Sequence, residues 1–120
     1  MPRTAYRHDE GKTAAWVQLV GERLRWAREI AADNQTQAAK LLRCDQSTWS
    51  LYERGERLLS LQVALRACQA WGLTLDYLYR GHLDSRVAQD MAVRLAAAHP
   101  ELVELPRAEA RRAKEAAPVA

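Results

Sequence analysis

The sequence predicts an all-α fold built around one hydrophobic core. Apolar residues recur at steps of three and four along most of the chain, which is the period of an amphipathic helix, and no stretch alternates as a strand would. Polar capping residues precede these stretches, and Gly or Pro follows several of them. A chain of 120 residues that is 48% apolar has room for one domain and a short extra element.

These signals place six helices in order along the chain. The expected ranges are 13–32, 35–42, 46–54, 61–71, 75–80 and 85–99. The expected N-caps of the first five are the polar residues Thr13, Asn34, Asp45, Ser60 and Thr74. Three left-handed C-terminal turns are expected, at Gly55, Gly72 and Gly81. A polar arm at 1–12 should precede the helices, and Pro100 should end the last one before a flexible, helix-prone tail at 100–120.

Charge and cysteine content narrow the class of protein. The chain has 18 Lys and Arg against 15 Asp and Glu, and the whole net charge of +3 arises within residues 1–81. This mild basic excess permits nucleic-acid binding without proving it. Cys44 and Cys68 are too few for a disulfide scaffold, and no apolar run is long enough to cross a membrane. We therefore expect a cytoplasmic protein, associated with the nucleoid if it binds DNA, and no membrane partner.

Catalytic and metal sites are not expected. His8, His82 and His99 have no Cys, Asp or Glu partner at the spacing of metal ligands. The triplet "HDE" at 8–10 lies on the arm, where consecutive residues cannot hold a fixed geometry. The sequence contains no Gly-rich phosphate loop and no nucleophile beside a base. We expect no enzyme, no metal and no cofactor.

The segment 46–54 carries polar side chains that a major groove could accept. At about 100° per residue, Trp49 and Tyr52 fall on one side of the expected helix. The opposite side presents side chains that can contact base edges: Gln46, Ser47, Ser50, Leu51 and Arg54. For an isolated helix, a solvated surface would be the simpler interpretation. Here another short helix precedes it across a tight turn, and Asn34 and Gln35 at its start suit a phosphate, so the pair predicts a helix-turn-helix.

Three segments resemble the lambda-repressor-like, Cro-type (XRE) family of helix-turn-helix regulators. They are "ERLRWARE", "NQTQAAKLLRCDQSTWSLYERGER" and "LSLQVALRACQAWGLTLDYLYRG", and together they cover about residues 19–81. The resemblance implies a five-helix DNA-binding domain at 13–81, followed in this chain by a C-terminal helix at 82–99. It also implies a sequence-specific regulator that binds double-stranded DNA, most simply a dimeric repressor of bacterial, phage or prophage type.

The resemblance implies roles for individual residues. Gln46, Ser47 and Leu51 take the base-contacting positions, and the helical wheel adds Ser50 to them. The positions that contact phosphates are taken by Asn34, Gln35 and Arg54, to which we add Arg57. Arg28 and Glu53 take the positions of an ion pair that ties two helices together, which we interpret as structural rather than functional.

The sequence also departs from the family pattern. Arg43 occupies the turn position usually given to Gly, so the chain either accepts a left-handed non-Gly residue or turns differently. Asp45 and Glu56 place acidic groups where they would face phosphates, which predicts modest affinity for each half-site. Ala38 and Trp49 exchange a large and a small side chain relative to the common pattern, which we interpret as a change in core packing.

A homodimer is expected because one recognition helix spans only a few base pairs. The expected contact surface is an apolar stripe within residues 75–98, formed by Leu75, Leu78, Val87, Met91 and Leu95. The alternative is an antitoxin-like interaction protein, in which residues 82–120 cover a protein partner and the helix-turn-helix only autoregulates. A third interpretation is an accessory factor that uses the fold without binding DNA.

Overall fold

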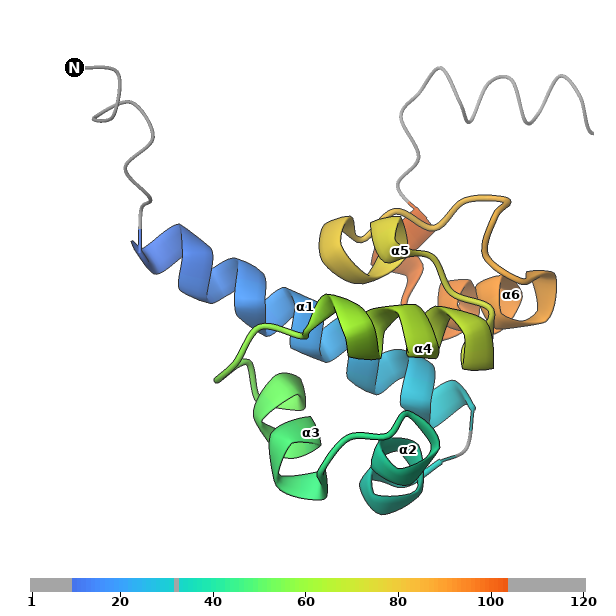
Figure 1. Ribbon diagram of the computed structural model, residues 1–120. Helices are drawn as coiled ribbons and strands as arrows, with labels where there is room; N and C mark the ends of the chain where they lie inside the picture. The colour runs from blue at the N-terminus through green and yellow to red at the C-terminus, as the bar shows by residue number, and fades with distance from the viewer. Residues whose placement is uncertain (1–9, 32, 104–120) are drawn as a thin grey trace, which may run out of the picture.

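The computed structural model describes residues 10–31 and 33–103, and every regular element in this part of the chain is helical (Figure 1). The elements in chain order are α1 Glu10–Ile30, α2 Gln35–Leu41, α3 Gln46–Glu53, α4 Leu61–Trp71, α5 Leu75–Arg80, α6 Gln89–Ala98 and the 3₁₀ helix η2 Pro100–Val103. The prediction of an all-α fold is confirmed.

Side-chain caps begin three of these helices as the sequence predicts. The oxygen atoms of Asn34, Ser60 and Thr74 each accept a hydrogen bond from the backbone N–H three residues further on, at 2.8, 3.2 and 3.0 Å. Gln37 reaches back to the N–H of Asn34 at 3.1 Å, which completes the capping box of α2. The predicted left-handed turns are also present, because the three predicted glycines all have positive φ.

One predicted cap is wrong, and another lacks its side-chain hydrogen bond. Thr13 lies inside α1, which already begins at Glu10, so residues 10–12 of the expected arm are helical. Lys12, Ala14 and Ala15 are good helix formers and nothing near them interrupts the helix, so a capping residue in their midst does not start it. Asp45 does occupy the N-cap position of α3, but its side chain makes no capping hydrogen bond.

Helix α1 runs through the middle of the fold and packs against α3, α5 and α6, while its N-terminal part projects from the body (Figure 1). Val20, Leu24 and Ala27 on its inner face are fully buried. Gly21 faces α3 at close range, where a Cβ atom would collide with the backbone oxygen of Tyr52. A glycine at this point lets α1 lie directly against the end of α3.

The predicted sixth helix starts later than expected, at Gln89 rather than Ser85. The carboxylate of Asp84 accepts a hydrogen bond from the N–H of Arg86 at 2.9 Å, which holds the chain in a turn. The N–H of Ala88 then donates to the carbonyl of Gly72 at 2.8 Å. Because these backbone groups are already paired outside a helix, α6 begins only after them.

The apolar stripe within residues 75–98, predicted as the dimer contact, is largely part of the core. Val87, Met91 and Leu95 are 3%, 8% and 0% exposed, and α6 packs against α1. Leu78 is fully buried as well, and Leu75 packs against the core as a partly buried residue. The prediction of a dimer contact is therefore wrong for Leu78, Val87, Met91 and Leu95, which the chain's own helices cover, and it stays a prediction for Leu75.

Beyond α6, Pro100 does not begin a tail at once. Residues 100–103 form η2, and Leu102 within it is 8% exposed and belongs to the core. His99 stacks on Trp26 of α1 with ring centroids 3.9 Å apart. The packed part of the chain thus extends past the end of α6, and the rest of the expected tail lies outside the described residues.

Candidate nucleic-acid interface

Helices α2 and α3 lie together at one end of the molecule, at the bottom of Figure 1, with α5 and α6 at the other end. Their connection is short, because α2 ends at Leu41 and α3 begins at Gln46. Two short helices joined by such a turn have the geometry of a helix-turn-helix, in which the second helix enters the major groove.

The turn between them closes without glycine. Arg43 has φ +57°, so the sequence alternative of a left-handed non-Gly residue is the one the chain adopts. The N–H of Cys44 donates to the carbonyl of Ala39 at 2.8 Å, which is the backbone pairing of a Schellman motif. Arg66 of α4 donates to the carbonyl oxygens of Leu42 and Arg43 at 3.1 and 3.4 Å. The guanidinium of Arg66 thereby fixes carbonyl groups that the turn leaves unpaired.

The inner face of α3 anchors it in the core. Trp49 is fully buried and Tyr52 is 5% exposed, as the helical wheel predicts. The ring of Trp49 meets that of Trp71 edge-on, with centroids 6.0 Å apart. This aromatic pair, on α3 and α4, belongs to the same buried core as Ala38, and the exchange of volumes between Ala38 and Trp49 stays a prediction.

Glu53, at the end of α3, joins three helices through one buried carboxylate. Its Oε2 accepts from Nε of Arg28 at 2.5 Å and from the indole N–H of Trp49 at 2.6 Å. Its Oε1 accepts from the other end of the Arg28 guanidinium at 2.9 Å and from the side-chain amide of Gln35 at 3.0 Å. The hydrogen bonds that Arg28 donates to Glu53 raise the pKa of Arg28 above its ordinary value. The predicted ion pair is present and ties α3 to α1, and the hydrogen bond from Gln35 adds α2.

The outer face of α3 presents the side chains predicted to read bases. Gln46 and Ser47 in its first turn are exposed, while Ser50 and Leu51 are partly buried. Asp45 is exposed just before them and, having no capping bond, leaves its carboxylate at the edge of this face. The structure therefore brings an amide and a hydroxyl to the open end of α3, with an acidic group beside them.

The residues predicted to contact phosphates differ in which side-chain hydrogen-bond donors they have free. Asn34 uses its side-chain oxygen in the helix cap, so its NH₂ group remains to donate. Gln35 donates one N–H of its side-chain amide to Glu53 and keeps the second N–H as a donor. A phosphate contact by the Gln35 side chain would use this second N–H, and its role stays a prediction.

Arg54 and Arg57 follow α3 and differ in the same respect. Arg54 is paired with Glu56, with NH2 of the guanidinium 2.8 Å from the carboxylate. Its NH1 donates to the hydroxyl of Ser50 at 3.1 Å. Arg57 is exposed and makes no ion pair within the described part of the chain. Both arginines lie within a few residues of the outer face of α3. Arg54 is paired with a carboxylate, whereas Arg57 is not.

Sequence reasoning missed two residues and one hydrogen bond that position this interface. Gly21, Arg66 and the indole N–H of Trp49 act across helices, through contacts between residues far apart in the chain. The one signal in the sequence was Gly21, inside a long amphipathic helix. Glycine destabilises a helix interior, so its presence there can indicate close packing against a neighbouring element. Nothing in the local sequence indicates that Arg66 binds the turn or that the indole of Trp49 binds Glu53.

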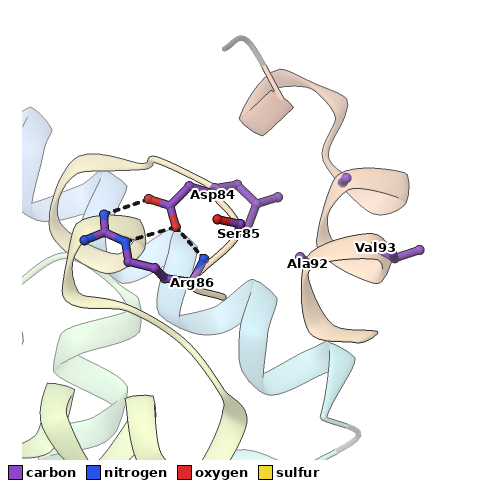
Figure 2. Close-up of a pocket in the computed structure, with 7 residues that line it drawn as sticks. Asp84, Ser85, Arg86, Ala92 and Val93 are labelled. Atoms are coloured by element: carbon purple, nitrogen blue, oxygen red, sulfur yellow. Dashed lines mark hydrogen bonds and ion pairs between the residues drawn. The ribbon is translucent and has the colours of Figure 1, made fainter. Parts of the chain in front are cut away.

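A hollow lies away from this interface, between residues 83–86 and α6 (Figure 2). It has a volume of about 570 Å³, and the side chain of Val93 at its edge points outward. Asp84 and Arg86 beside it are paired with each other at 2.7 Å. In the described ranges no three His, Cys, Asp or Glu side chains are grouped as a metal site, and no helix is both long and apolar enough to cross a membrane.

Comparison with known proteins agrees with this geometry. A family model described as a helix-turn-helix domain matches residues 19–78, which begin within α1 and end within α5. The comparisons with curated proteins and with solved structures gave no match. The matched segment contains α2, the turn and α3 in full, and it covers half of the chain. With its two short helices, its buried anchor and its exposed polar face in this arrangement, the chain belongs to the family of helix-turn-helix domains.

Proposed function

We propose that this protein is a sequence-specific transcriptional regulator, in form a dimeric repressor that binds an inverted repeat in double-stranded DNA. The observation that carries the proposal is the pair Gln46 and Ser47, exposed on the first turn of a helix whose other end is tied into the core by Glu53. A rigid helix with short polar side chains at its open end can enter a major groove, where an amide pairs with adenine.

The charge near α3 supports two copies rather than one. Lys40, Arg43 and Arg57 are exposed around the interface, but Asp45 adds an opposing charge, and Arg54 is matched by Glu56. Phosphate contacts supply most of the sequence-independent affinity for DNA, so a domain with few free cations binds each half-site modestly. Two domains on adjacent half-sites, about 10 to 10.5 base pairs apart from centre to centre, would restore the affinity.

The surface that joins two copies cannot be the predicted stripe on α6, which is buried. Three leucines in the loop after α3 and on α4 are exposed instead: Leu58, Leu61 and Leu65 at 40%, 56% and 49%. We propose a two-fold contact through these leucines, with the two recognition helices facing the same DNA. They offer far less apolar surface than the about 800 Å² per partner of a stable interface, so the dimer should be weak in solution and form on DNA.

Selection of bound fragments from random double-stranded DNA tests the proposal. Wild type should enrich an inverted repeat, and Gln46→Ala should relax the choice at one position of each half-site, costing about 1 to 3 kcal/mol there. Gln69→Ala, which removes an exposed amide from α4, is the matched control and should leave the selected sequence unchanged.

Three outcomes would contradict parts of this proposal. Enrichment of no sequence at all would refute DNA reading and favour an interaction protein that acts through residues 82–120. Identical base preferences for wild type and Gln46→Ala would remove Gln46 from the readout. A single asymmetric half-site, bound at one-to-one stoichiometry, would refute the dimer while leaving the helix-turn-helix in place.

A further inference from the structure

Arg54 is the predicted phosphate contact at the end of α3, and its guanidinium is already occupied. Nε and NH2 lie 2.9 and 2.8 Å from the same oxygen of Glu56, and NH1 donates to the hydroxyl of Ser50. A guanidinium has five N–H donors, and the atoms Nε, NH1 and NH2 of this one each already have a partner within the protein. A phosphate could use Arg54 fully only if one of these partners were given up.

The partner that competes with a phosphate is Glu56 rather than Ser50. A hydroxyl has no charge, so it can share Arg54 with a phosphate, whereas a carboxylate neutralises the guanidinium and repels the phosphate. The side chains of Arg54 and Glu56 are 58% and 55% exposed. An exposed ion pair of this kind adds little to folding, so the fold gives no reason for it.

The surroundings reinforce this effect. Arg54 and Glu56 line a polar hollow of about 490 Å³ between α1 and the end of α3, which Gln18, Glu22, Arg25 and Glu53 also line. The charge of Glu53 is matched by Arg28, and Arg25 lies 3.9 Å from Glu29. Arg54 therefore lies among carboxylates, of which that of Glu56 makes the direct contact.

We propose that Glu56 competes with DNA phosphate for the guanidinium of Arg54, and that it thereby sets the affinity and salt dependence of DNA binding. This inference rests on the proposed DNA-binding function. When DNA approaches, the carboxylate either keeps Arg54, and one phosphate contact is lost, or releases it and faces the phosphates unpaired. In both cases binding releases about one counterion fewer from the DNA than it would if Arg54 had no carboxylate partner. Glu56 is thus a positioning residue that limits how tightly α3 is held on DNA.

The test is a comparison of Glu56→Gln with wild type on the selected DNA, at several salt concentrations. Glu56→Gln should bind more tightly at low salt, and the slope of log K against log salt should be steeper by about 0.9. The advantage over wild type should therefore shrink by about 3.5-fold between 50 and 200 mM salt. Asp90→Asn is the matched control, because it removes a carboxylate from an exposed pair with Arg94 on α6, away from α3, and it should leave the slope unchanged.

The same substitution in an Arg54→Ala background separates competition from general charge. If Glu56 acts by holding Arg54, Glu56→Gln should tighten binding much less once Arg54 is absent. An equal gain in both backgrounds, or no gain in wild type, would overturn the inference. Circular dichroism of each variant checks that the fold is retained. If wild type itself binds no DNA, the proposed function fails, and this result is distinct from an unchanged slope in a protein that does bind.

Discussion

Replacing Glu53 by Gln should destabilise the whole domain, although the two side chains have nearly the same shape. Oε2 accepts from Arg28 and Trp49, and Oε1 accepts from Arg28 and Gln35. An amide turns one of these oxygens into an NH₂ group, so in either orientation two donors face a donor. Two buried hydrogen bonds are lost, at about 1 to 3 kcal/mol each.

The expected loss agrees with the cost of breaking a buried ion pair, about 3 to 5 kcal/mol. The Arg28 and Glu53 side chains are only 13% and 3% exposed, so little solvent screens the pair. Domains have a free energy of unfolding of about 5 to 15 kcal/mol, and such a loss removes a large part of it. The substitution should therefore shift the unfolding midpoint strongly, or leave the protein unfolded.

Urea unfolding followed by tryptophan fluorescence measures the change. Glu56→Gln is the matched control, because it removes an exposed carboxylate three residues away and should cost less than about 1 kcal/mol. A loss below about 1 kcal/mol for Glu53→Gln would refute the reasoning, because a surface pair would show the same value. Addition of salt separates the two cases further, since screening weakens exposed pairs much more than buried ones.

Three further predictions concern stability and assembly. Met91→Glu should unfold the protein in a thermal melt, because it buries a charge in the core, while Val93→Glu on the exposed side of α6 should not. Burial raises the pKa of Tyr77; the folded state therefore holds this proton more tightly, and stability should be lost as pH rises above about 10, the ordinary tyrosine pKa. In thermal melts at alkaline pH, the stability of Tyr77→Phe should fall less steeply with pH than that of wild type. An equally steep fall would contradict this. Leu61→Glu should reduce binding of two copies to one operator in sedimentation, and unchanged stoichiometry would exclude this leucine from the interface.

The helix ends that the sequence predicted correctly depend on local chemistry. Asn34, Ser60 and Thr74 cap their helices because a short polar side chain reaches an amide three residues on, whatever the rest of the fold does. The Arg28–Glu53 pair and the exposed face with Gln46 were predicted from the resemblance and from a helical wheel. The ion pair is confirmed, and DNA contact by Gln46 remains a prediction.

The errors concern features that depend on contacts between distant parts of the chain. The stripe at Val87, Met91 and Leu95 was read as uncovered because the sequence does not show that α1 continues to lie beside α6. The late start of α6 depends on a hydrogen bond from Ala88 to Gly72. The four-donor arrangement around Glu53 likewise joins residues from three helices. Periodicity identifies an apolar face, but only the packing decides what covers it.

The close packing of α6 on the rest of the fold limits how this protein could be recombined with others. A Cβ atom at Gly72 would collide with the side chain of Ala88, so the segment before α6 lies directly on the end of α4. The family match stops at residue 78, yet Trp26 of α1 stacks on His99, and Leu102 belongs to the same core. A hybrid regulator that carried only the matched segment would leave the partners of α6 open to water and prone to aggregation. The transplantable module is the longer one, with its junction placed after Leu102.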